Sequence, residues 1–517
     1  MISHRDLLKI VTAIALVGGT VACDPDKLTD LNSNPNSPED APPGPLFTQA
    51  ARLTASRWLG GAYDLRGAAL LSQHLAQVQY PDEDAYSRLT GGATTTYFDF
   101  PYYTELEDLQ KVVLKGEALD EPGIYGPALV LRTYGFGFLT DTWGDIPYSE
   151  ALQGDQGGSL TPAYDSQQSI YDDFFVVLNQ ASDDMGGTVG ATLGDADPIY
   201  GGDVSAWRRF ANSLRARHAL RLVNVNATKA STELAAAFSD PGGVFASNDD
   251  NALLRWPGDG VYDNPWSVNF QTRDDHRMSD RLMSIMLASS DPRIPIYAQP
   301  TTDDPNVYAG MPNALTHSDA SEYFNIASRP GAAFFPGQTS YGFFGGPAGK
   351  AFPSFLMTYA EVAFIKAEAA ERGLGGLTAG QAGAFYREGI RASMEQWGVA
   401  DADITAYLAR PEIVYAGGVA GLRQIAVQKW IALYTDGGQA WFEWRRTCQP
   451  ANVKPGPAAI INTVPRRLEY SITEESVNGA SLAAAIDRQG EDDFETRMYW
   501  DSAPTTAPTY FAGCGVR

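Results

Sequence analysis

The 517-residue sequence has little of what catalysis and metal binding commonly require. It contains 3 cysteines and 5 histidines, and it lacks the HExxH, GxSxG and CxxC motifs of metal, serine and thiol chemistry. Four histidines follow the N-terminal segment, and no two of them have the helical spacing of metal ligands: His74, His218, His276 and His317. These absences predict a protein that is not an enzyme and that binds no metal and no cofactor.

Positive charge is also scarce. Lys and Arg number 38 against 62 Asp and Glu, which gives a formal net charge of −24. A chain this acidic repels phosphate backbones, so nucleic-acid binding is not expected. Hydrophobic residues at 44% and charged residues at 19% predict a large folded body and exclude intrinsic disorder. After the N-terminal segment no apolar run approaches the roughly 18 residues of a membrane-spanning helix.

The N-terminus has the pattern of a bacterial lipoprotein signal. A short basic start is followed by an apolar stretch over residues 10–17, which is too short to span a bilayer, and then by Ala22-Cys23. The pattern predicts a signal peptide over residues 1–22 and a lipid on the thiol of Cys23. An ordinary secretory signal is the alternative. Asp, Asn, Ser and Pro dominate residues 23–45, which predicts a flexible tether.

Two cysteines remain if Cys23 carries the lipid. Cys448 and Cys514 form an even pair in an exported, oxidising compartment. A disulfide between them would fasten the C-terminal tail to the body. Two buried thiols explain the same pair equally well.

Residues 46–517 have the pattern of a helical body. Apolar residues recur three and four positions apart, which places them on one face of each helix. The expected helices cover residues 46–58, 65–78, 98–114, 126–141, 166–185, 205–225, 355–370, 382–397 and 422–434. Short Gly-containing turns between helix pairs predict a mainly α fold with a tetratricopeptide-like scaffold.

An insert at about residues 230–352 departs from the helical pattern. It is rich in Pro, Gly, Asp and aromatic residues. Long irregular segments on a rigid scaffold are where recognition residues commonly lie, so a binding site is expected there. The tail from Pro450 is expected to be irregular as well.

Several blocks resemble the SusD/RagB family of nutrient-binding outer-membrane lipoproteins. They are WGDIPY at 143–148, PSFLMTYAEVAFIKAEA at 353–369, QKWIALYTDGGQAWFEWRRT at 428–447 and VPRRL at 464–468. The blocks occur in the family's order along nearly the whole chain. We interpret their residues as fold markers, with Glu443 and either Arg445 or Arg446 forming an ion pair that fixes the fold.

The resemblance implies a helical lipoprotein that is attached to the outer membrane by its lipid anchor and faces the cell exterior. Family members cap a SusC-like TonB-dependent barrel transporter and hold oligosaccharides or peptides for uptake. Two other functions fit the same residues: a secreted helical glycoside hydrolase, or a tetratricopeptide scaffold that binds only protein. A cleft lined by two carboxylates would favour the hydrolase.

The family's ligand contacts lie on variable loops, so candidate residues are chosen from the loops of this sequence. One loop offers Tyr80, Asp82 and Tyr86, and the insert offers Tyr262, Trp266, Phe270, Arg273, Tyr341 and Phe343. Aromatic rings stack on the C–H faces of sugars, and Asp and Arg bind hydroxyl groups. Such side chains suit peptides equally well, and core packing is the alternative for any single ring.

Overall fold

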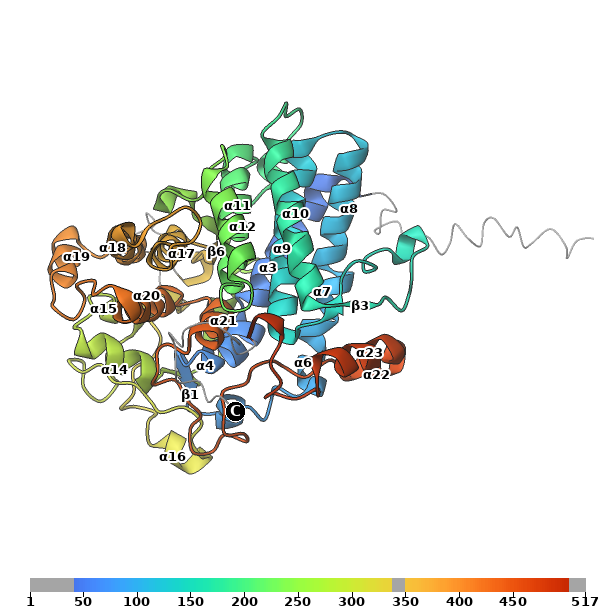
Figure 1. Cartoon of the computed structure of the whole chain (residues 1–517). Coiled ribbons are helices and arrows are strands. Elements are labelled where there is room, and N and C mark those ends of the chain that lie inside the picture. The colour runs from blue at the N-terminus through green and yellow to red at the C-terminus, as the bar shows by residue number, and fades with distance from the viewer. Residues whose placement is uncertain (1–40, 337–348, 502–517) are drawn as a thin grey trace, which may run out of the picture. The chain divides into compact units, whose positions relative to one another are not determined.

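The computed structural model describes residues 41–336 and 349–501 (Figure 1). By internal contacts the chain divides into Met1–Pro42 and Pro43–Arg517, and the helical body is the second unit. The expected signal peptide, Cys23 and most of the tether lie outside the described residues. So do three further residues that the sequence singled out: Tyr341, Phe343 and Cys514.

The first half of the body is built from long helices packed side by side. They are α3 (Pro43–Trp58), α8 (Glu105–Ala118), α9 (Pro122–Trp143), α10 (Gln167–Met185), α11 (Val204–Arg221) and α12 (Ala227–Ser239). Each of α8 to α12 contacts the next in Figure 1. The central helix is α9, which is buried on nearly every face because it carries only two charged residues. At Gly135 a Cβ would lie 2.9 Å from Leu106 of α8, so glycine allows the close packing.

The second half repeats the helix-pair arrangement. It contains α17 (Tyr359–Glu371), α18 (Ala379–Gln396), α19 (Asp401–Leu408), α20 (Gly418–Ala432) and α21 (Gly437–Thr447). Helices α17 and α18 pack closely, since a Cβ on Gly389 of α18 would meet the Phe364 ring of α17 at 2.8 Å. The predicted mainly α class and helix-pair scaffold are confirmed.

Three short antiparallel sheets join segments that are distant in sequence. β1 (Leu75–Gln77) pairs with β5 (His276–Met278), and β4 (Ala252–Leu254) pairs with β6 (Ser354–Met357). β2 (Ile146–Pro147) pairs with β3 (Tyr164–Asp165). The first two sheets hold the insert against the scaffold, since β4 and β5 belong to the insert.

Short helices complete the described body. The α-helices are α4 (Ala69–Leu71), α5 (Pro81–Asp84), α6 (Gly91–Phe98), α7 (Phe100–Tyr103), α13 (Pro265–Phe270), α14 (Asp280–Ala288), α15 (Ile294–Tyr297), α16 (His317–Ser321), α22 (Ile472–Val477) and α23 (Gly479–Gln489). The others are the π-helix η1 (Gly61–Ala68) and the 3-10 helices η2 (Gly154–Gln156), η3 (Gly194–Ala196), η4 (Asn248–Asp250), η5 (Ala332–Phe334), η6 (Gly349–Ala351) and η7 (Tyr499–Asp501).

Four expectations about elements are wrong in part. The helix expected over 65–78 ends at Leu71, and the one expected over 355–370 begins at Tyr359, because strands β1 and β6 occupy the remaining residues. A break at Thr104 divides the helix expected over 98–114 into α7 and α8. The tail contains α22 and α23. The strands depend on distant partners, which a local apolar period does not report.

A buried network of ion pairs joins three helices of the body. Arg217 of α11 pairs with Glu361 of α17 at 2.5 Å, and Arg446 of α21 pairs with Glu368 of α17 at 2.6 Å. Arg446 also pairs with Glu443 at 2.6 Å, which confirms the expected ion pair. Burial alone would raise the pKa of Glu368, but the neighbouring Arg446 and Arg372 outweigh it and lower that pKa to about 2. These motif residues therefore hold the fold together.

Candidate functional site

A pocket of about 440 Å³ lies where α3, η1 and α13 meet the loop before α13. We call it the Tyr262 pocket. It is lined by Arg52, Ser56, Gly61, Ala62, Arg66, Trp256, Val261, Tyr262, Asp263, Pro265, Val268 and Asn269. It contains one of the aromatic residues predicted from the sequence, and that ring is exposed: Tyr262 is 44% exposed.

The loop before α13 turns Tyr262 outward. The Asp259 carboxylate accepts the backbone N–H groups of Val261 and Tyr262 at 2.9 and 2.8 Å, which closes a tight turn. Asp263 accepts the Gly260 N–H at 2.8 Å and pairs with Lys350 at 3.0 Å. These bonds fix the turn, so the Tyr262 ring is held at the mouth of the pocket.

Two arginines from the helical scaffold line the same pocket. The Arg52 guanidinium lies 5.2 Å from the centroid of the Tyr262 ring, within the range of a cation–π contact. Its Nη2 donates to Gln49 Oε1 at 3.0 Å. Arg66 Nε donates to Glu83 of α5 at 2.7 Å and thereby links the pocket to the loop that begins at Tyr80.

The two candidate loops chosen from the sequence meet at Tyr80 and Arg273, neither of which lines this pocket. The Arg273 guanidinium lies 4.6 Å from the centroid of the Tyr80 ring, and Tyr80 is 44% exposed. Arg273 also pairs with Asp275 at 2.6 Å. Asp82 is half-exposed, with its carboxylate 3.4 Å from His317 Nε2. The structure therefore brings together Tyr80 and Arg273, which are 193 residues apart by their numbers.

Three other candidate rings are buried, which is the core-packing alternative that the sequence left open for any single ring. Trp266 is 3% exposed, and its Nε1 donates to Asp64 at 3.2 Å. Phe270 stacks on Phe335 with centroids 4.5 Å apart, and Tyr86 is fully buried. A long insert needs apolar side chains of its own to pack on the scaffold, and these rings supply them.

Sequence reasoning missed Arg52, Arg66 and Asn269. Arg52 and Arg66 lie in the first two helical segments, which were interpreted only as scaffold. Asn269 is in the insert, on α13, whose buried residues are Trp266, Ser267 and Phe270. The sequence did contain one indication of this pocket. Arg52 and Ser56 lie four residues apart and so share one polar face of α3.

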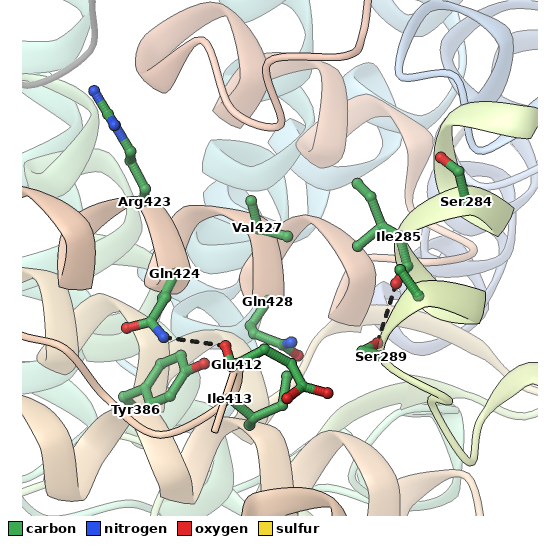
Figure 2. A pocket seen from close by; sticks show the side chains of 11 residues that line it. Ser284, Ile285, Ser289, Tyr386, Glu412, Ile413, Arg423, Gln424, Val427 and Gln428 are labelled. Carbon is green, nitrogen blue, oxygen red and sulfur yellow. Dashed lines mark hydrogen bonds between the residues drawn. The ribbon is translucent and has the colours of Figure 1, made fainter. Parts of the chain in front are cut away.

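A second pocket, of about 590 Å³, lies between α14, α18 and α20 (Figure 2). Its walls combine apolar side chains with amides and hydroxyls: Ser284, Ile285, Ala288, Ser289, Tyr386, Glu412, Ile413, Arg423, Gln424, Val427 and Gln428. Gln424 Nε2 donates to the Glu412 carbonyl at 3.3 Å. The buried Tyr386 hydroxyl has no hydrogen-bond partner among the described residues, and burial raises its pKa.

The described part of the chain holds no group of three or more His, Cys, Asp or Glu that could bind a metal ion. Over the same residues, no helix is both long and apolar enough to cross a membrane. Cys448 follows α21 in a left-handed conformation and takes part in a disulfide. Cys514 is not among the described residues, so its pairing with Cys448 stays a prediction.

A helical scaffold that presents rings and guanidinium groups around an open pocket defines a ligand-binding protein. The comparisons give its family. A SusD-like family model described as "Starch-binding associating with outer membrane" matches residues 35–471. The chain belongs to this SusD-like family, which confirms the resemblance found in the sequence.

Solved structures agree over nearly the whole chain. A chitin-binding SusD homolog from Flavobacterium johnsoniae is 27% identical, with a TM-score of 0.73, and the match covers 89% of this chain and 97% of that one. A second chitin-binding protein is 26% identical with a TM-score of 0.75, covering 89% and 100%. A SusD homolog from Bacteroides uniformis shares the fold at 23% identity and a TM-score of 0.77, covering 90% and 100%. The comparison with curated proteins gives no match.

Proposed function

We propose that this chain is an outer-membrane lipoprotein that binds oligosaccharides in the Tyr262 pocket and delivers them to a SusC-like TonB-dependent transporter. Membership of a starch-binding family that associates with the outer membrane supports the proposal. So do two chitin-binding structures of similar fold at 27% and 26% identity. The observation that carries it is the exposed Tyr262 ring, which is fixed by its turn in an open pocket.

The pocket suits a sugar ring for physical reasons. The C–H face of a pyranose stacks on an exposed aromatic ring, and neighbouring donors bind its oxygens. Here Tyr262 supplies the ring, and Arg52 and Asn269 supply N–H donors. Tyr80 offers a second exposed ring beside Arg273, so a chain of several sugars has more than one place to stack.

We infer binding without turnover. Glycoside hydrolysis commonly uses two carboxyl groups that flank the scissile bond. Asp263 is the one carboxylate among the described residues that line the Tyr262 pocket, and it is held by Lys350. A carboxylate in that ion pair is poorly placed to protonate a leaving group or to activate water.

Tyr262→Ala tests the site. Calorimetry against chito- and malto-oligosaccharides should show binding to the parent and at least about fivefold weaker binding to the variant, because one stacked ring is worth on the order of 1 kcal/mol or more. Tyr103→Ala is the matched control, since Tyr103 is an exposed tyrosine on α7 and does not line the pocket. Unchanged affinity in a folded Tyr262→Ala variant would place the site elsewhere.

The anchor and the partner need separate tests. Cys23→Ser should abolish palmitate labelling and release the protein from outer-membrane fractions. A variant that stays labelled and membrane-bound would refute lipidation at Cys23. Cross-linking of the wild-type protein in intact outer membranes should capture a TonB-dependent barrel, and recovery of the protein alone would count against the delivery step.

A further inference from the structure

We infer that the ligand of the Tyr262 pocket is an anionic glycan, one whose sugar residues carry a carboxylate or a sulfate ester. This inference rests on the proposed function of the pocket as a glycan site. It goes further by assigning the charge of the ligand, which follows from the unequal supply of hydrogen-bond donors and acceptors in the pocket.

Arg52 is the first part of the argument. Its guanidinium contacts the Tyr262 ring and donates to the neutral side chain of Gln49. No carboxylate among the described residues lies within ion-pair distance, 4 Å, of Arg52. A positive charge is therefore presented at the mouth of the pocket beside the ring on which a sugar would stack.

Further donors line the pocket. Arg66 directs Nε and Nη2 to Glu83, and its Nη1 makes no hydrogen bond with the described residues. Asn269 Nδ2 is buried and has no hydrogen-bond partner among them. A buried donor without a partner is costly, so an acceptor atom of a ligand would stabilise it.

The acidic groups around the pocket already have partners. Glu83 accepts from Arg66, and Asp259 accepts the backbone N–H groups of Val261 and Tyr262. Asp263 is the lining carboxylate, with a side chain only 5% exposed, and its oxygens are occupied by Gly260 N–H and Lys350. Neutral sugars present hydroxyl groups that both donate and accept, whereas a carboxylate or a sulfate ester only accepts. A pocket of guanidinium and amide donors therefore matches an anionic group better than it matches a hydroxyl group.

The charge of the whole chain opposes anion binding, so the pocket must supply positive charge of its own. With a formal net charge of −24, the protein as a whole repels anions. Arg52, which has no acidic partner among the described residues and contacts the exposed Tyr262 ring, is a local exception to this negative charge. Binding of an anionic glycan in this pocket would also weaken as salt screens the guanidinium charge.

The test compares ligands that differ only in charge. Calorimetry would measure oligogalacturonides against their neutral methyl esters, and sulfated against unsulfated malto-oligosaccharides. We expect the charged member of at least one pair to bind the parent about tenfold more tightly or better, with affinity falling as salt rises. The pair that shows the preference identifies the anionic group as carboxylate or sulfate.

Variants then locate the preference. Arg52→Gln should remove most of the preference for the charged ligand, and Arg52→Lys should keep part of that preference. Thermal melting should show that both variants remain folded. Arg423→Gln is the control, because it removes an exposed arginine from the other pocket and should change nothing.

The remaining outcomes separate the anionic ligand from the proposed glycan-binding function. Charged and neutral glycans could bind equally well, with binding that is lost in Tyr262→Ala and unaffected by Arg52→Gln. That result would overturn the anionic ligand and leave the proposed function standing. Absence of any Tyr262-dependent glycan binding would overturn both. Preference for an acidic oligopeptide over every charged glycan would also overturn the inference.

Discussion

Tyr386 of α18 is completely buried, and its hydroxyl finds no hydrogen-bond partner among the described residues. Leaving a buried polar group unpaired commonly costs about 1–3 kcal/mol. Tyr386→Phe removes that hydroxyl and keeps the ring, so we expect the free energy of unfolding to rise by about 1 kcal/mol. Urea denaturation measures the change.

The matched control is Tyr407→Phe. The buried Tyr407 hydroxyl lies 3.4 Å from Ser289 Oγ and accepts from Gln428 Nε2 at 3.0 Å. Its removal should lower the free energy of unfolding by about 1 kcal/mol. Equal losses in both variants would show that the Tyr386 hydroxyl has a partner, such as a bound water or ligand in the second pocket.

Single residues of the insert show where sequence reasoning reached its limit. Tyr262 and Trp266 lie four positions apart in one Pro-Gly-rich loop, and both were equally good candidates. Tyr262 is turned outward by Asp259, whereas Trp266 follows the Asn264 cap of α13 and packs 5.0 Å from Phe334. The exposure of each ring depends on the fold of the loop and on distant partners, which composition does not contain.

At the scale of elements, α21 offers a test of pH dependence. Asp436 caps this helix, with its carboxylate accepting Gln439 N–H at 3.1 Å. Burial raises the pKa of Asp436 from 3.8 to about 7, against the lowering effect of Arg217. The folded state thus holds this proton more tightly than the unfolded state. Its contribution to stability is complete below about pH 4 and is lost as pH rises through about 7.

Asp436→Asn should therefore stabilise the protein increasingly, relative to the parent, as pH rises from about 4 to 7. Asparagine keeps the cap and removes the charge. Asp203→Asn on α11 is the opposite control, because hydrogen bonds outweigh partial burial and lower the pKa of that carboxyl. That variant should lose stability relative to the parent as pH rises. Parallel profiles for both variants would contradict the assignment.

Helix positions were largely predictable from apolar spacing. The expected helices at 166–185 and 205–225 correspond to α10 (Gln167–Met185) and α11 (Val204–Arg221). Both begin at capping residues, Ser166 and Asp203, whose side chains accept backbone N–H groups. A helix whose capping residue and apolar spacing are local can be predicted from the sequence. Strands β1 and β6 form only by pairing with strands that are distant in the sequence, so they cannot be predicted in this way.

At the scale of the whole molecule, the tail is part of the core. Trp500 is fully buried, and its Nε1 donates to Asp141 of α9 at 2.8 Å. The guanidinium groups of Arg221 and Arg445 lie 5.2 and 4.7 Å from its ring. Trp500→Ala should lower the free energy of unfolding by about 3–5 kcal/mol, as deletion of a buried aromatic side chain commonly does.

Chemical denaturation measures that loss, and Phe100→Ala, which removes a ring that is 45% exposed, should cost far less. Similar small losses in both variants would mean that the tail packs loosely. At this scale the order of family blocks along the sequence was sufficient to predict the architecture. It was not sufficient for the pocket, because Tyr262, Arg52 and Arg66 lie outside those blocks.

The buried charges also bear on the order in which the chain can fold. Arg217 and Glu361 are 144 positions apart in the sequence, and Asp141 and Trp500 are 359 positions apart. Until the C-terminal helices arrive, the N-terminal helices would have to bury charges that have no counterpart, which is strongly unfavourable. Completion of the body therefore waits for nearly the entire polypeptide. The N-terminal helices therefore reach their final packing only after the C-terminal residues have been synthesised.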